Sequence, residues 1–482
     1  MQSFYWHDYE TFGADPAHDR PSQFAGVRTD AELNIIGEPL ILYCQPGEDY
    51  VPDPDACLIT GITPQKAREE GLVEAAFIGR ILDEFSQPGT CVVGYNSLRF
   101  DDEVTRHTLF RNLRDPYARE WQNGNSRWDI IDMVRLTYAL RPEGIVWPRN
   151  EDGSPSFRLE KLTEANGIAH EAAHDAMSDV YATIAMARLI REKQPRLFEY
   201  VLTHKDKASA FAMLDVQRMQ PVFHVSSRYP ARLGCGALVA PIARHPDNPN
   251  AVIVYDLRED PEPLLTATVE QIRDRLFVPQ DQLPPGERRI PLKAVHANRC
   301  PILTPAAMLK TLSSERLAEM ELDGDRLREH LSRLRTADGL ADKVATVFQA
   351  RAPSADSVPD VDESLYSGGF IGKADREKLN RLLQVEPAHM GEETPSFEDA
   401  RLDEMVFRYR ARNFPSTLDG EEQERWERFR QQRLIQPSAG WRSLPAYLET
   451  IALRLQQHDI SARDRHILEE LHYWGEALIP YL

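Results

Sequence analysis

Two acidic residues, Asp8 and Glu10, end a hydrophobic run near the start of the chain, in the sequence DYET at residues 8–11. In a β-strand, residues i and i+2 share a face, so this spacing directs both carboxylates toward one point. Carboxylate oxygens are the ligands that Mg²⁺ prefers in proteins. The alternative interpretation is a solvated acidic strand end, which is the commoner meaning of such a pair when it stands alone. The pair therefore indicates a metal site only if further acids accompany it.

Further acids follow at the ends of other predicted elements. Asp101 comes after the short β-branched run at residues 90–95 and opens a predicted helix. Asp179, with His174 five positions before it, lies at the start of a long amphipathic pattern. Each has an ordinary alternative: Asp101 as a helix N-cap, Asp179 as a partner of the helix dipole, and His174 as a capping or surface imidazole. Taken together, these residues favour one shared site.

Such a site would suit phosphodiester hydrolysis. Four clustered carboxylates carry about −4 at neutral pH, because the ordinary pKa values of carboxyl groups lie near 4. Two Mg²⁺ ions cancel that charge, and two metals about 3.5–4 Å apart can activate a water and stabilise the leaving oxygen. An imidazole, with an ordinary pKa of about 6.5, can remove a proton from that water. The oxygen donors favour Mg²⁺, or Mn²⁺ as a substitute, over zinc.

The first 195 residues must position these groups, and they alternate strand and helix patterns. Strands are predicted at residues 3–9, 23–28, 39–43 and 90–95, and helices at 63–70, 73–85, 101–113, 129–140, 158–165 and 176–193. Strands followed by helices in this order indicate an α/β sheet domain.

The remaining sequence changes character twice. Residues 196–350 carry short β-like runs at 222–225, 237–241, 252–256 and 289–295, with helical patterns near 314–335. Residues 351–363 are rich in Pro, Ser and Asp and are predicted to be a linker. Residues 364–482 are predicted to be helical, with clear patterns at 373–383, 421–434, 448–455 and 467–478. We therefore expect three domains.

Composition excludes several classes of protein. The chain has 482 residues, 42% of them hydrophobic and 28% charged, which is enough apolar material for several cores. Five scattered cysteines without a CxxC motif argue against a disulfide framework or a thiolate zinc site. The N-terminus lacks the features of a secretion signal, and no apolar run reaches the ~20 residues of a membrane span, so we expect a cytoplasmic protein. The net charge of −19 leaves room for an enzyme that handles nucleic acid through a local basic lining and bound metal ions.

The order of the motifs carries a family resemblance. DYET at residues 8–11, NxxxFD at 96–101 and HxxxxD at 174–179 resemble the DEDDh 3′→5′ exonucleases, which have a ribonuclease-H-like α/β fold. Longer segments, among them residues 94–112 and 409–418, resemble the bacterial exonuclease I family over essentially the whole chain. The resemblance implies an SH3-like β-rich domain and an all-α C-terminal domain after the exonuclease domain. It also implies processive 3′→5′ degradation of single-stranded DNA to 5′-mononucleotides, in DNA repair and recombination.

The resemblance also assigns roles within the acidic set. Asp8, Glu10 and Asp179 would hold the metal that binds the attacking water, and Asp8 would bridge to a second metal. Asp101 would act on the metals directly or through water, and Glu10 would also contact the terminal 3′-hydroxyl. His174 would be the general base.

Substrate contacts are implied at positively charged and aromatic residues. Arg158 would grip a phosphate near the scissile bond, although from sequence alone it could equally be a surface ion pair. Arg106, Tyr117, Trp121 and Arg135 become candidate contacts to the strand; the alternative for the aromatic residues is a place in a helical core.

Two further basic segments and one partner site remain. Residues 288–299 and 407–414 are rich in basic residues, and each could line the strand or form a structural seam of stacked guanidinium groups. The family binds the acidic C-terminal tail of single-stranded DNA-binding protein, and Arg141 and Tyr200 match its peptide site. The resemblance also implies that the three domains enclose the strand, and we expect a monomer.

Two other functions compete with this hypothesis. One is an RNA-trimming exonuclease of the same superfamily, whose members are usually far shorter. The other is a binding or scaffold protein with an inactive nuclease domain, which the intact set of acids and histidine disfavours.

Overall fold

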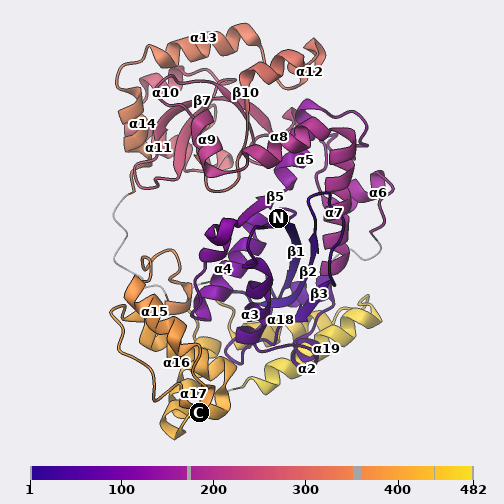
Figure 1. Ribbon diagram of the computed structural model, residues 1–482, viewed down its shortest axis with the longest axis vertical. Coiled ribbons are helices and arrows are strands. Elements are labelled where there is room, and N and C mark those ends of the chain that lie inside the picture. Colours follow the sequence, from indigo (N-terminus) through magenta and orange to yellow (C-terminus); the bar gives the residue numbers. More distant parts are fainter. Residues whose placement is uncertain (1–2, 171–174, 351–359, 439, 480–482) are drawn as a thin grey trace. The chain divides into compact units, whose positions relative to one another are not determined.

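The computed structural model describes residues 3–170, 175–350, 360–438 and 440–479. The chain divides into two compact units, whose helices and strands are labelled in Figure 1. The first comprises Met1–Arg127, His170–Ile184 and Ala355–Leu482, and the second comprises Trp128–Ala169 and Ala185–Ser354.

A five-stranded mixed sheet forms the centre of the first unit, in the order β3-β2-β1-β4-β5. Its strands are β1 (Ser3–Thr11), β2 (Pro21–Thr29), β3 (Leu40–Tyr43), β4 (Thr90–Gly94) and β5 (Ser126–Asp129), the last of which ends in the second unit. Strand β1 pairs antiparallel with β2 and parallel with β4. The predicted α/β sheet is confirmed, and β1 lies in its middle.

Strand β1 continues two residues beyond its predicted end at residue 9, because Glu10 still pairs with Gln23 of β2 before the register shifts. Tyr5 and Tyr9 point to one face and pack in a core that includes Phe77 of helix α3. Since side chains alternate along a strand, Asp8 and Glu10 lie on the opposite face. The hydrophobic residues of β1 thus fix the direction of its acids.

Four helices accompany the sheet in this part of the unit: α1 (Pro54–Thr60), α2 (Pro64–Glu70), α3 (Glu74–Phe85) and α4 (Asp101–Arg111). The sequence patterns predict the last three helices but not α1. Its signals are nevertheless local: Asp53 accepts a hydrogen bond from the Asp55 amide, Pro54 occupies the first turn, and Gly61 ends the helix at φ 72°. The apolar and β-branched residues inside α1 obscured them.

Helices dominate the C-terminal part of the first unit, as predicted. They are α15 (Lys373–Leu382), α16 (Arg401–Asn413), α17 (Gly420–Ile435), α18 (Leu444–Leu455) and α19 (Ala462–Ala477). Helices α18 and α19 share one core with α1 and α2, in which Ile451 and Leu471 pack with Cys57 and Ile62. A second core joins α15 and α16 to Phe110 of α4. The two ends of the sequence therefore fold together.

The second unit contains an antiparallel sheet in the order β10-β6-β7-β8-β9. Its strands are β6 (Val222–Val225), β7 (Gly236–Arg244), β8 (Ala251–Asp256), β9 (Leu292–His296) and β10 (Ile302–Pro305). Its helices are α5 (Ile131–Leu140), α6 (Leu159–Ala165), α8 (Pro195–His204), α9 (Lys207–Met213), α10 (Glu262–Thr266), α11 (Val269–Leu276), α12 (Ser314–Glu319), α13 (Gly324–Arg335) and α14 (Leu340–Phe348). Helix α7 (Ala176–Lys193) begins in the first unit and ends in the second.

Two remaining expectations concern the linker and the membrane. Residues 351–359 of the predicted linker lie outside the described residues, whereas Val361–Glu363 form a 3₁₀ turn in which Asp362 is buried. Across the described part of the chain, the helices are too short or too polar to cross a bilayer.

Candidate active site

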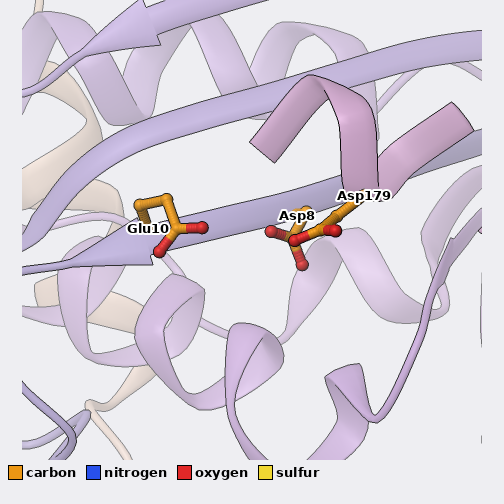
Figure 2. A group of neighbouring side chains, drawn as sticks. All are labelled: Asp8, Glu10 and Asp179. Atoms are coloured by element: carbon orange, nitrogen blue, oxygen red, sulfur yellow. The ribbon is translucent and has the colours of Figure 1, made fainter. Parts of the chain in front are cut away.

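Three carboxylates converge where β1 meets the first turn of α7. Asp8 and Glu10 come from β1 and Asp179 from α7, and one oxygen of each lies within 4.8 Å of the others (Figure 2). An all-oxygen donor set of this kind fits Mg²⁺ or Mn²⁺. The two acids on the strand precede the acid on the helix by 171 and 169 residues along the chain, yet the fold brings all three into one candidate metal site.

Asp101 lies next to this group. It is the first residue of α4, where the N-cap is Phe100, and its Oδ1 accepts a hydrogen bond from the Tyr9 amide at 3.1 Å. The carboxylate is therefore directed to β1, and the alternative interpretation of Asp101 as an N-cap is wrong. The bond is made between Asp8 and Glu10 along the strand, which places the fourth acid beside the three-carboxylate group.

The electrostatics of the site favour bound cations. Burial, Asp101, Glu10 and Asp179 together raise the pKa of Asp8 well above its ordinary value. Burial and then the charges of Asp179 and Asp101 raise the pKa of Glu10 to about 8. Without a cation, the carboxylates repel one another and retain protons at neutral pH. Bound divalent metals would remove this penalty, so the donor set fits the ions that the sequence predicts.

The structure adds a histidine that the sequence analysis missed. His174, the predicted general base, lies outside the described residues. His170 is described, and its Nε2 lies 2.5 Å from Oδ1 of Asp179. The sequence signal for His170 is its place four residues before His174, in AHEAAHDAMSD at residues 169–179, but only His174 has the HxxxxD spacing to Asp179.

Three of the predicted substrate residues present exposed or partly exposed surface. The Arg158 side chain, just before α6 in the second unit, is 73% exposed, and Glu160 is 4.0 Å away. Trp121 is 66% exposed, so the core alternative is wrong for it. Tyr117 is half-buried, with the Arg106 guanidinium 5.4 Å from its ring centre. These side chains have surface with which to contact a ligand.

Two further predicted substrate residues, Arg106 and Arg135, are buried arginines in ion pairs. Arg106 binds Glu120 through Nε and Glu103 through Nη1, each at 2.8 Å. Arg135 binds Asp132 at 2.6 Å and lies over the ring of Phe157. A phosphate that contacts either guanidinium would have to share it with these carboxylates or displace them.

Two exposed aromatic residues from the C-terminal segment lie beside the predicted ones. The ring of Phe370, which is 87% exposed, lies 5.7 Å from the ring of Tyr117 in an edge-on arrangement. Tyr366 is 57% exposed, and its hydroxyl accepts a hydrogen bond from Arg106 at 3.2 Å. Both belong to LYSGGF at residues 365–370, a segment in which no site residue was predicted.

The predicted partner residues both belong to the second unit. Arg141 donates a hydrogen bond to Thr311 Oγ1 at 2.7 Å. Tyr200 donates one to the Leu303 carbonyl at 3.0 Å, and its ring stacks on His204.

The basic segment at residues 407–414 is structural. Arg408 and Arg412 pair with the buried Asp362, and Arg408 also stacks on Phe429. Arg410 pairs with Glu422. The seam of stacked guanidinium groups is therefore confirmed for this segment.

Comparisons with known protein families match three consecutive segments of the chain. Residues 5–187 match the family described as Exonuclease, residues 205–350 the Exonuclease I SH3-like domain, and residues 359–478 the Exonuclease I C-terminal domain. Exodeoxyribonuclease I of Escherichia coli (strain K12) is 46% identical over 480 residues, covering 99% of this chain and 98% of that protein. The chain belongs to the exodeoxyribonuclease I family.

Solved structures of the family agree. Exonuclease I from Methylocaldum szegediense has a TM-score of 0.94 and 53% identity, covering 99% of this chain and 100% of that one. The zinc-bound form of an Escherichia coli exonuclease I complex with single-stranded DNA has a TM-score of 0.92 and 45% identity, with the same coverage. The predicted fold class, with an α/β exonuclease domain, an SH3-like domain and a helical C-terminal domain, is confirmed.

Proposed function

We propose that the protein is a processive 3′→5′ exodeoxyribonuclease that degrades single-stranded DNA to 5′-mononucleotides by two-metal-ion hydrolysis, in DNA repair and recombination. The observation that carries the proposal is the group of Asp8, Glu10 and Asp179, whose oxygens lie within 4.8 Å of one another. Its family setting supports the substrate, because a relative of the same length and fold has been crystallised with single-stranded DNA.

Asp8, Glu10 and Asp179 would hold the catalytic metal, and Asp101, fixed by the Tyr9 amide, would support the second. The bound Mg²⁺ ions would activate the attacking water and stabilise the charge of the leaving oxygen. Glu10 would also contact the terminal 3′-hydroxyl, and His174 would accept a proton from the attacking water. The Escherichia coli relative has been crystallised in a zinc-bound form together with single-stranded DNA. The preference for Mg²⁺ here rests on the oxygen donors.

Strand binding would combine one cation with several aromatic surfaces. Arg158 is the exposed arginine assigned to the phosphate, and a planar guanidinium can make two parallel hydrogen bonds to it. Trp121, Tyr117 and the adjoining Phe370 offer rings on which unpaired bases can stack. Arg106 and Arg135 keep their predicted role as strand contacts only if each guanidinium can bind a phosphate of the strand as well as its present carboxylate partner.

The remaining assignments are proposals of the same kind. Arg141 and Tyr200 would bind the acidic C-terminal tail of single-stranded DNA-binding protein, since an arginine can pair with a terminal carboxylate. The domain boundaries at residues 195, 350 and 363, the monomeric state and the cytoplasmic location stay predictions.

Digestion of end-labelled oligonucleotides tests the proposed function. With Mg²⁺, we expect single-stranded DNA to be shortened from its 3′ end to mononucleotides, while duplex DNA and RNA of the same sequence persist. EDTA should abolish the reaction. Asp8→Asn should lower turnover by several decades with the fold intact, whereas the control Asp83→Asn, which removes an exposed carboxylate of α3, should leave it unchanged.

Three outcomes would contradict the proposal. Equal activity in EDTA would exclude the metal mechanism. Faster digestion of RNA than of DNA would favour the RNA-trimming alternative. Full activity of Asp8→Asn would mean that the degradation comes from a contaminant and that the protein is a scaffold.

A further inference from the structure

Asp179 is the member of the three-carboxylate group that comes from a helix and not from the sheet. Asp8 and Glu10 are fixed by the pairing of β1 with β2, where Asp8 is opposite Ala25 and Glu10 opposite Gln23. Asp179 lies instead in the first turn of α7, where the Ser178 amide donates a hydrogen bond to the Asp175 carboxylate at 3.2 Å. Like charges on the strand repel this carboxylate, so its position needs a restraint that the sheet does not supply.

His170 is placed to supply that restraint. Its side chain is 5% exposed, and its Nε2 lies 2.5 Å from Oδ1 of Asp179, whose side chain is 20% exposed. An imidazole N–H that donates to one carboxylate oxygen fixes the rotation of the carboxyl group. The second oxygen then keeps a defined direction.

We propose that His170 is a positioning residue that holds the Asp179 carboxylate in the orientation required to bind a divalent metal. The role rests on the proposed function, because it needs Asp179 to be a metal ligand. Hydrogen bonds to ligating carboxylates characteristically orient them, and their loss typically costs 10–100-fold in metal affinity or activity. His170 thus differs in role from His174, which is the proposed base.

Two substitutions separate the hydrogen bond from the bulk of the side chain. His170→Gln places an amide N–H near the position of Nε2, whereas the shorter amide of His170→Asn does not reach it. His330→Ala is the matched control: His330 is also buried, and its Nδ1 bonds to the Leu257 carbonyl at 2.7 Å in the second unit. It tests the cost of losing a buried, bonded histidine without touching the acidic group.

Mn²⁺ binding to the full-length protein without DNA is the first measurement, made by electron paramagnetic resonance of the free ion. We expect His170→Asn to weaken Mn²⁺ binding 10–100-fold, and His170→Gln to stay within a few-fold of the wild type. The Mg²⁺ concentration that half-activates the nuclease should rise by a similar factor, while turnover at saturating Mg²⁺ changes little. His330→Ala should leave Mn²⁺ binding unchanged.

Other results would overturn the role. Equal Mn²⁺ affinity in folded His170→Asn and wild type would show that the bond does not position Asp179. Equal affinity with slower turnover at saturating Mg²⁺ would make His170 a participant in proton transfer. Equal losses in the Asn and Gln variants would indicate a packing role only. A wild type that binds Mn²⁺ but does not degrade DNA would refute the proposed function and leave this measurement decisive.

Discussion

At the scale of a single residue, the pKa of Glu10 reflects the electrostatics of the acidic site. In the unfolded chain its carboxyl has an ordinary pKa of about 4.5, whereas burial and the neighbouring acids raise the pKa to about 8 in the folded, metal-free protein. Between these values the folded state holds a proton that the unfolded chain has released. The contribution of Glu10 to the free energy of unfolding therefore falls as pH rises from about 4.5 to 8.

Urea unfolding of the metal-free protein tests this prediction. We expect Glu10→Gln, which cannot ionise, to be more stable than the wild type in EDTA by a margin that grows from pH 5.5 to pH 7.5. Mg²⁺ should shrink that margin, because it neutralises the carboxylate that the variant lacks. Glu38→Gln, at an exposed position, is the control and should show no trend. A margin independent of pH would contradict the raised pKa.

At the scale of elements, a buried seam of ion pairs along α16 links distant segments of the first unit. Arg412 contacts Asp49 at 2.9 Å and Asp362 at 2.6 Å, and the side chains of both acids are almost fully buried. The two partners come from segments 313 residues apart in the sequence. Their pKa values are held low mainly by Arg412, so both stay charged near neutral pH.

Arg412→Met should therefore be strongly destabilising. It keeps side-chain volume but leaves buried carboxylates without their principal partner, a change that typically costs about 3–5 kcal/mol. Arg428→Met in α17 is the control, since Arg428 is 62% exposed and 3.6 Å from Glu424, and it should cost less than about 1 kcal/mol. Chemical unfolding measures both. A loss below about 1 kcal/mol for Arg412→Met would show that the remaining arginines of the seam compensate.

The sequence predicts a helix or strand best where its apolar residues follow a single periodicity along the whole element. Helix α7 has the predicted bounds because its apolar residues recur at helical spacing over five turns. Strand β1 is longer than predicted because pairing with β2 continues through its polar end. The sequence could not decide whether residues 407–414 bind the strand or form a buried seam, because their acidic partners Asp49 and Asp362 are distant in sequence.

For the whole molecule, local sequence patterns predict only part of the arrangement of the site. Period-two alternation pairs Asp8 with Glu10, but nothing local brings Asp101 or Asp179 to them; the order of family motifs supplied that step. The burial of Arg106 depends on Glu120, fourteen residues away, and on the way the intervening loop folds. Convergence of distant charges is thus the part that the sequence alone could not derive.

Because the whole molecule is strongly acidic, any favourable contacts to a DNA strand must be local. A chain with a charge of −19 repels DNA, so affinity must come from bound metal, stacking and individual exposed cations such as Arg158. On the inactive Asp8→Asn background, Arg158→Ala should weaken binding of a single-stranded oligonucleotide. We expect the slope of log affinity against log salt concentration to become shallower by about 0.7, the value of one phosphate contact to a single strand. Fluorescence anisotropy between 50 and 200 mM salt measures this slope. Arg328→Ala removes an arginine of the same 73% exposure and should leave the slope unchanged. Equal slopes for Arg158→Ala and its parent would contradict the phosphate contact.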